Sequence, residues 1–202
     1  MYSPSYNRLE DRRELLEFMR ANSFAVLVTG TGGTLHASHL PVLVREAGEK
    51  LVLDMHMAKN NPQWQEFFDD EVLVIFTGPH AYVSPSWYAE RGPVPTWAYV
   101  AVHCYGTAVL HDGAGTERNI ARLVERMEGQ RSNRWSMSDL EPAEKDELIA
   151  NVVSFEIPVT RMEAKFKVNQ RDRPERVHAL IAELERSGDA ELASYVRRYN
   201  PT

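Results

Sequence analysis

The stretch "FAVLVTGTGGTLHASHLPVLVRE" covers residues 24–46 and places two strand-like runs around a pair of glycines. The first run, 24–30, is continuously apolar, as expected of a buried strand. Gly32-Gly33 is a strong signal for a two-residue hairpin, because the favoured hairpin turns need residues that adopt positive φ. The second run, 35–46, is therefore predicted to return antiparallel to the first.

Further strands are predicted at short intervals over 51–57, 71–78 and 96–111, with a long loop over 79–95. Helices are predicted near the N-terminus and later in the chain, and 152–168 reads as extended, with Pro158 indicating a bend or a sheet edge. Closely spaced strands followed by helices predict an α+β fold, an antiparallel β-barrel with peripheral helices. The sequence contains no G-x-G-x-x-G pattern, and a Rossmann domain is therefore disfavoured.

Composition narrows the class of protein. The chain has 202 residues, a net charge of −6 and a pI of about 5.7, which fits one large domain over 1–202 and disfavours an autonomous nucleic-acid binder. The single cysteine, Cys104, excludes an internal disulfide and fits a reducing compartment. No signal peptide or apolar run of roughly 18 residues is evident, so a cytoplasmic protein without membrane segments is expected.

The segment "HMAKNNPQW", residues 56–64, joins a predicted strand to a helix predicted over 62–68. Asn61 suits the N-cap and Pro62 the first helical position. Free N–H groups at a helix N-terminus attract anions, and Lys59 and His56 lie just before it, so a phosphate site is one interpretation. The alternative is that Asn-Pro simply caps a helix, with Lys59 solvated and Trp64 in the core.

The strand predicted over 96–111 has two different faces. Ala98, Val100, Val102 and Cys104 form an ordinary barrel interior. The other face carries Trp97, Tyr99, Ala101, His103 and Tyr105, and is too aromatic for an ordinary solvent face. It suits a flat ligand, a subunit interface, or both.

Other segments leave alternatives open. The loop predicted over 79–95 carries Tyr82, Trp87 and Tyr88 and is read as a lid, an interface or a packed loop.

His36 and Ser38 alternate with His39, so the two histidines do not form a simple clamp and no metal site is predicted. Cys104 is expected to be buried rather than nucleophilic, and no catalytic residue is identified. The lysines in "EAKFKVNQRDR" either blunt an edge strand or form a cationic arm that reaches a phosphate.

Several motifs occur together and in order along nearly the whole chain: "MYSPSYNRLED", "ASHLPVLV", "HMAKNNPQW", "VIFTGPHAYVSPSWY", "VPTWAYVAVHCYG" and "KFKVNQ". Together they closely resemble the PaiB-like family, described as FMN-binding negative transcriptional regulators. The resemblance implies a single FMN-binding split-barrel domain over 1–202, with a C-terminal helical pair over 173–200. It also implies a homodimer that binds FMN at the subunit interface.

The resemblance further implies positions for the cofactor-binding residues. The phosphate and ribityl end is expected at Ser38, His39, His56, Met57, Ala58, Lys59 and Asn60. The isoalloxazine is expected near Trp97 and Tyr99, with Trp87, Lys165 and Gln170 completing the pocket. Lys59 stands where the family more often has arginine, which grips phosphate bidentately, so weaker FMN binding is expected here.

Three functions are compatible with these patterns. The first is an FMN-binding negative transcriptional regulator. Direct DNA binding is disfavoured because the chain is acidic and its last helix offers only Arg197 and Arg198 as basic residues. The second is a flavin-dependent oxidoreductase of unknown substrate, in which the flavin carries the redox chemistry. The third is a haem-binding or haem-degrading split-barrel relative.

Overall fold

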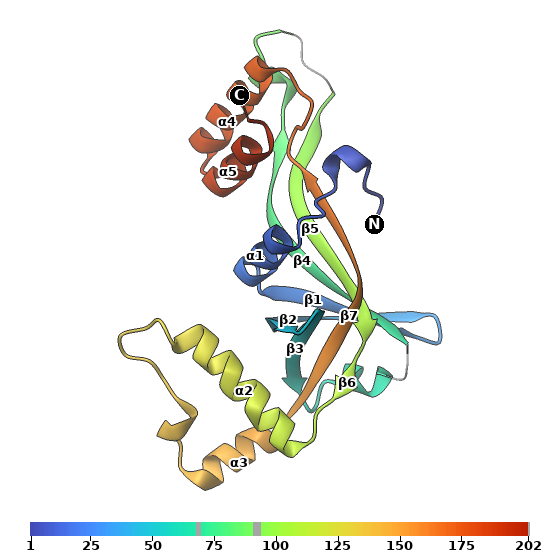
Figure 1. Cartoon of the computed structure of the whole chain (residues 1–202), viewed down its shortest axis with the longest axis vertical. Coiled ribbons are helices and arrows are strands. Elements are labelled where there is room, and N and C mark those ends of the chain that lie inside the picture. The colour runs from blue at the N-terminus through green and yellow to red at the C-terminus, as the bar shows by residue number, and fades with distance from the viewer. Residues whose placement is uncertain (68–69, 91–93, 202) are drawn as a thin grey trace. The chain divides into compact units, whose positions relative to one another are not determined.

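The computed structural model describes residues 1–67, 70–90 and 94–201. The chain divides into two compact units (Figure 1). The first unit comprises Met1–Phe18, Thr77–Val102 and Glu163–Thr202, and the second comprises Met19–Phe76 and His103–Met162. One helix, α1 (Arg12–Ala21), and three strands, β4 (Glu71–Val83), β5 (Thr96–Thr107) and β7 (Val152–Lys167), contribute residues to both units.

The predicted hairpin is present in the second unit. Strands β1 (Phe24–Thr31) and β2 (Thr34–Ala47) pair antiparallel, with Thr31 opposite Thr34. Gly32 and Gly33 between them have φ of 60° and 86°, a conformation that side chains with a Cβ rarely adopt. The hairpin prediction is therefore confirmed, and its glycines account for the tight turn.

The strands close into a barrel. Strand β3 (Lys50–Ala58) pairs with β2, and the sheet order is β3-β2-β1-β4-β5-β7-β6, where β6 is Val109–Leu110. Because β3 also pairs with β7, in a register that sets Val52 opposite Pro158, the sheet returns to its own first strand. Together with the helices around it, this confirms the α+β prediction of an antiparallel barrel.

The interior of the second unit is apolar and tightly filled. Leu27, Leu53, Phe76, Phe155 and Ile157 are fully buried. Cys104 packs with its Sγ 3.5 Å from Met19 Sδ, and burial raises the pKa of its thiol to about 12. At that pKa the thiol stays protonated at neutral pH, as predicted for a buried, unreactive cysteine.

Helices α2 (Gly113–Glu128) and α3 (Pro142–Ala150) also belong to the second unit, where α2 contacts β2, β3 and α3. Asp112 caps α2, since its Oδ1 accepts a hydrogen bond from Gly115 N–H. Asn119, on the buried face of α2, donates to the carbonyl of Met55 at 2.9 Å. A polar side chain therefore ties this helix to β3.

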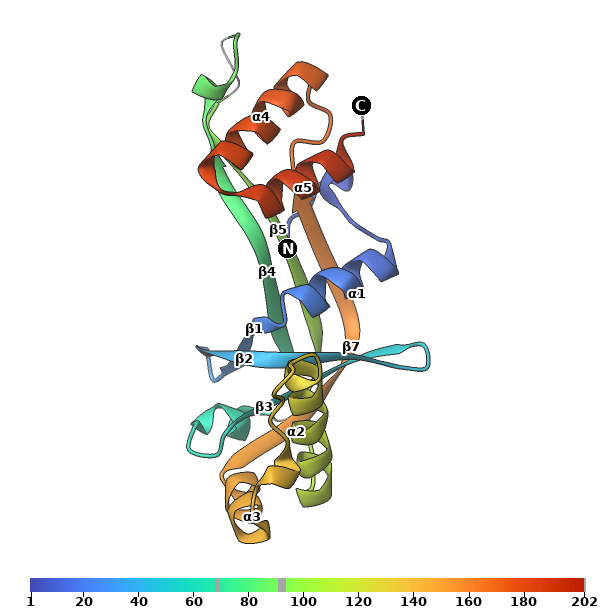
Figure 2. The same cartoon turned by 90° about the vertical axis from the view of Figure 1, so that its left-hand side faces the viewer.

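In the first unit, helices pack against β7 through edge-to-face contacts between aromatic side chains. Helix α4 (Pro174–Ser187) ends at Gly188, with φ of 91°, and α5 (Ala190–Tyr199) returns beside it (Figure 2). Phe166 of β7 makes edge-on contacts with Phe18, Tyr195 and Tyr199, with ring centroids 5.5, 5.8 and 5.4 Å apart. Such pairs add stabilisation beyond that of burial alone.

The loop predicted over 79–95 is wrong in its first part. Strand β4 continues to Val83 and is followed by the short 3-10 helix η3 (Pro85–Trp87). Gly78 suggested a turn, but a Cβ there would lie 2.4 Å from the Phe18 ring, so this glycine serves close packing. Residues 91–93 of the predicted loop lie outside the described residues.

Two other boundaries and the interpretation of Pro158 as a sheet edge need correction. The helix predicted over 62–68 is a 3-10 helix, η2 (Pro62–Glu66), and position 68 lies outside the described residues. The strand predicted over 96–111 is interrupted after Thr107. Pro158 marks no sheet edge, because β7 pairs with β3 on one side and follows β5 in the sheet order.

The single-domain assignment over 1–202, with its helical pair over 173–200, stays a prediction. Among the described residues, no helix is both long enough and apolar enough to span a lipid bilayer.

Candidate functional site

The segment 56–64, hereafter the β3 junction, is held by hydrogen bonds. Asn61 Oδ1 accepts from Gln63 N–H at 3.0 Å, which confirms the predicted cap. Asn61 Nδ2 donates to Ser38 Oγ on β2 at 2.9 Å, and Trp64 Nε1 donates to the Lys59 carbonyl at 3.0 Å. The cap therefore occupies one of the N–H groups that an anion would need, and η2 is only five residues long.

Side chains at the β3 junction differ in exposure. Met57 is 2% exposed and belongs to the core, so only its backbone is available to a ligand. Burial lowers the pKa of the His56 imidazole, which favours its neutral form. Ala58, Lys59 and Asn60 are exposed, and Lys59 Nζ makes no ion pair within the described ranges. Lys59 is thus the available cation of this segment.

Strand β2 presents its two histidines on opposite faces, as alternation predicts. His36 Nδ1 lies 2.6 Å from Glu66 Oε1 of η2, on the side where Ser38 meets Asn61. The His39 ring lies 6.2 Å from the exposed Phe24 ring on the other side. His39 and Ser38 therefore do not line one continuous surface of β2.

Gln63, which the sequence analysis did not single out, anchors η2 beneath β1 and β2. It is 3% exposed, and its Nε2 lies 3.1 Å from Thr29 Oγ1 and 3.2 Å from the His36 carbonyl. Its Oε1 is buried without a hydrogen-bond partner among the described residues. No local pattern distinguishes this glutamine from a solvated one, because its partners lie on distant strands.

The first unit displays an exposed aromatic surface formed by His80, Tyr82 and Trp97. Trp97 is 53% exposed, and its ring centroid lies 6.0 Å from Tyr82 and 6.3 Å from His80. His80 and Tyr82 are two residues apart on β4 and therefore share a face of that strand. A group of exposed rings of this kind is typical of a ligand-binding or subunit-contact surface.

Lys165 lies beside Tyr99, as the predicted site requires. Its Nζ is 5.4 Å from the Tyr99 ring centroid and donates to the Tyr2 carbonyl at 3.1 Å. Distances of this size allow a cation–π attraction. The structure therefore brings a predicted aromatic and a predicted cation together on β5 and β7.

Gln170 and Trp87 are placed differently. The Gln170 carboxamide folds back onto β7, where its Oε1 accepts from Val168 N–H at 3.0 Å and its Nε2 donates to the Phe166 carbonyl. In this arrangement Gln170 holds the chain turn rather than reaching a ligand. Trp87 ends η3, with its backbone N–H bonded to the Ser84 carbonyl at 3.2 Å.

The predicted cofactor-binding residues divide between the two units. The second unit holds the predicted phosphate and ribityl end: Ser38, His39, His56, Met57, Ala58, Lys59 and Asn60. The first unit holds the predicted ring end: Trp87, Trp97, Tyr99, Lys165 and Gln170.

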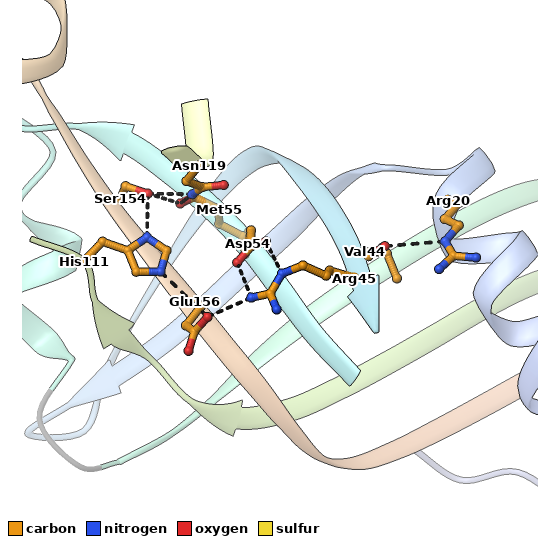
Figure 3. A network of polar contacts seen from close by, with 9 residues as sticks. All are labelled: Arg20, Val44, Arg45, Asp54, Met55, His111, Asn119, Ser154 and Glu156. Carbon is orange, nitrogen blue, oxygen red and sulfur yellow. Dashed lines mark hydrogen bonds and ion pairs between the residues drawn. The ribbon is translucent and has the colours of Figure 1, made fainter. Parts of the chain in front are cut away.

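A polar network that the sequence analysis missed crosses β2, β3 and β7 (Figure 3). Arg45 donates to both oxygens of Asp54, at 2.8 and 3.1 Å, and to Glu156 at 2.8 Å. The Asp54 side chain is 1% exposed. The hydrogen bond from Arg45 to Asp54 raises the pKa of Arg45. The charges of Asp54 and Glu156 act in the same direction, and partial burial opposes them. The available signal was a lone aspartate inside the apolar strand "LVLDMHM".

His111 extends this network. Its Nδ1 lies 3.0 Å from Ser154 Oγ and its Nε2 lies 3.8 Å from Glu156. Asp54, His111 and Glu156 place ligand atoms within 4.8 Å of one another, a spacing that would suit a metal ion. The Arg45 guanidinium already donates hydrogen bonds to both carboxylates, so we interpret the cluster as an internal ion-pair network.

Sequence comparison places this arrangement in a family. A family model described as "Putative FMN-binding domain" matches residues 1–161. The protease synthase and sporulation protein PAI 2 of Bacillus subtilis (strain 168) is 35% identical over 171 residues, covering 84% of this chain and 82% of that protein.

Solved structures share the fold at low sequence identity. The flavocytochrome Anf3 from Azotobacter vinelandii superposes with a TM-score of 0.62 at 13% identity, covering 86% of this chain and 75% of that one. The FAD and heme binding protein from Mycobacterium smegmatis gives a TM-score of 0.60 at 14% identity, covering 84% and 78%. With the family match over 1–161, the chain belongs to the FMN-binding domain family, the PaiB-like family that its motifs resemble.

Proposed function

We propose that the protein is a homodimeric FMN-binding negative transcriptional regulator. The observation that carries the proposal is family membership over residues 1–161. PAI 2, the related protein, is named for protease synthase and sporulation, which agrees with a regulatory role.

The ring end of the ligand fits the exposed aromatic surface of the first unit. Trp97 and Tyr82 present rings to solvent, and Tyr99 lies beside the Lys165 ammonium. A bound flavin would supply a flat π-system and a redox centre. The protein would stack against it through Trp97 and orient it through Tyr99 and Lys165.

The β3 junction offers a group suited to the FMN phosphate, the Lys59 ammonium. Lys59 is an exposed cation without an ion pair in the described part of the chain, and it follows β3 directly. Ser38 and Asn60 add a hydroxyl and a carboxamide, which can donate hydrogen bonds to phosphate oxygens. His56 and the backbone at Met57 and Ala58 complete the proposed lining on this face, and His39, on the opposite face of β2, would contact the ligand only from the other side of the strand.

The homodimer rests on the same aromatic surface. Exposed tryptophan and tyrosine rings are enriched where chains associate. A partner copy placed over Trp97 and Tyr82 would remove these rings from water and enclose the ligand. Sedimentation equilibrium with and without FMN tests this part: a monomer under both conditions contradicts it.

Of the two alternative functions, the haem alternative has a specific observation behind it. Neighbours of the same fold include a flavocytochrome and an FAD and heme binding protein, so haem is the competing ligand. His80, close to Trp97 on the aromatic surface, is the histidine placed to contact it. A flavin-dependent oxidoreductase would use the same surface, and aerobic and anaerobic assays with reduced nicotinamide cofactors separate it from a regulator.

The deciding experiment is the visible absorption of the purified protein, with mass spectrometry of the ligand released on denaturation. We expect the two-banded spectrum of an oxidised flavin and the mass of FMN. A single intense Soret band identifies haem and overturns the flavin assignment. Gel-shift assays at physiological salt test DNA binding, since electrostatic contacts weaken as salt rises.

A further inference from the structure

The turn that joins β7 to α4, residues 169–173, hereafter the β7 turn, has an uncommon backbone. Asn169 and Arg171 have φ of 61° and 69°. Left-handed conformations are rare for residues other than glycine, and rarer for a long side chain than for asparagine. Such a conformation is strained and persists where surrounding contacts impose it.

Specific hydrogen bonds impose this conformation. The Gln170 carboxamide bonds backbone groups of Val168 and Phe166. Asp172 N–H donates to the Asn169 carbonyl at 3.2 Å. As a result, Arg171 is directed over the ring of Tyr6, with its guanidinium carbon 4.6 Å from the ring centroid.

A cavity of about 270 Å³ opens at this turn. Three of its lining residues are cations, Lys167, Arg171 and Arg176, and one is an acid, Asp172. Lys167 Nζ donates to the Thr96 hydroxyl, and Arg176 lies 3.6 Å from Asp172. Neither Lys167 nor Arg171 makes an ion pair with a described residue. The charged lining therefore has a surplus of two positive charges.

A second cavity, of about 540 Å³, shares Arg176 with the first. It is lined by Tyr88, which is 8% exposed and whose buried hydroxyl makes no hydrogen bond of good geometry, although the Asn169 side chain lies close enough to lower its pKa. Burial, and secondarily the Asp172 carboxylate, raises the pKa of this phenol, so the hydroxyl remains a donor. Buried hydroxyls without a partner are uncommon and indicate water or a ligand.

We propose that these two neighbouring cavities of the first unit, which share Arg176, bind a small phosphate monoester. The phosphate would lie among Lys167, Arg171 and Arg176, and the organic part would extend toward Tyr88. A dianion matches the surplus of two positive charges, and guanidinium groups suit phosphate oxygens geometrically. This site goes beyond the proposed FMN site, whose phosphate is assigned to Lys59.

The surroundings favour a small ligand over a nucleic acid. Glu90 and Glu175 line the second cavity, beside Arg173. Carboxylates at the rim repel an extended polyanion, whereas a single phosphate can occupy the cationic part alone. The cavity volumes also correspond to small-molecule sites.

Calorimetric titration of inorganic phosphate and phenyl phosphate into FMN-saturated protein at low salt tests the proposal. We expect both to bind, phenyl phosphate more tightly, and added chloride to weaken both. Arg171→Gly keeps the left-handed turn without strain, and Lys167→Met keeps the length of the chain. Each should weaken phosphate binding by about tenfold or more, the effect of losing one charge-assisted hydrogen bond.

Arg186→Ala is the matched control, because Arg186 lies on α4, carries the same charge and pairs with Glu183 at the surface. It should leave phosphate binding unchanged. Absence of phosphate binding to the unsubstituted protein, or equal loss in Arg186→Ala, overturns the proposal. If Arg171→Gly and Lys167→Met instead weaken FMN itself, the pocket holds the flavin phosphate, and the separate site is refuted while FMN binding stands.

Discussion

The β3 junction and the β7 turn both follow a strand and both carry cations, yet they use their polar groups differently. At the β3 junction, Asn61 and Trp64 bond to the protein itself and leave Lys59 as the exposed charge. At the β7 turn, Gln170 and Asp172 hold a strained backbone that directs Arg171 into a cavity.

The difference shows that a cap pattern and an anion site are separate properties. An Asn-Pro sequence indicates the start of a helix, but the capping side chain accepts a hydrogen bond from a backbone N–H that a ligand would need. The β7 turn has no such motif, and its cations converge only because the chain folds back on itself.

Removing Asp54 should have the largest effect, because the strand leading to the β3 junction contains a buried ion-pair network. Asp54→Ala leaves Arg45 with one of its two carboxylates, and the free energy of unfolding should fall by about 3 kcal/mol. Urea denaturation of both proteins measures this. The exposed pair Arg13–Glu17 is the control: Arg13→Ala should cost about 0–1 kcal/mol.

Removing the Asn61 cap should show that the β3 junction contributes more to stability than the Arg171 side chain of the β7 turn does. Asn61→Ala loses the bonds to Gln63 and Ser38 and should destabilise by about 1 kcal/mol. Arg171→Gly relieves a left-handed residue and loses one contact with Tyr6, so its stability should stay within about 0.5 kcal/mol of the parent. Equal losses in the two variants would show that the β7 turn is structural.

The pH dependence of stability should reveal the burial of His56. Its pKa lies below the ordinary 6.5 in the folded state, because burial disfavours the charged imidazole. As pH falls through about 6.5, the unfolded state takes up the proton first, and stability decreases toward the folded pKa. His56→Gln should therefore lose less stability than the parent between about pH 7.5 and 5. Parallel pH curves for the two proteins would contradict this.

Much of the fold could be predicted because its signals are local. The Gly32-Gly33 hairpin, the two faces of β5 and the end of α4 at Gly188 each depend on residues close in sequence. The extension of β4 was missed because Gly78 and the following proline read as a turn. The role of Gly78 in the structure, close packing against Phe18, depends on a residue 60 positions earlier in the chain (78 minus 18).

The candidate site was harder to predict, because its geometry depends on long-range contacts. The sequence indicated Lys59, Trp97 and Lys165, which are exposed or half-exposed in the structure. It missed Gln63 and Asp54, whose importance comes from burial by distant strands and helices. Gln170 stays a predicted ligand contact, and in the structure its carboxamide bonds to backbone groups of Val168 and Phe166.

The most direct test of the account compares FMN with riboflavin, which lacks the phosphate, by fluorescence titration of the parent, Lys59→Ala and Arg171→Gly. The account predicts that the parent prefers FMN, that Lys59→Ala loses most of that preference, and that Arg171→Gly keeps it. Lys59→Arg should strengthen the preference, because arginine can bind phosphate bidentately. Loss of the preference in Arg171→Gly, with Lys59→Ala unchanged, would contradict the assignment of the FMN phosphate to the β3 junction.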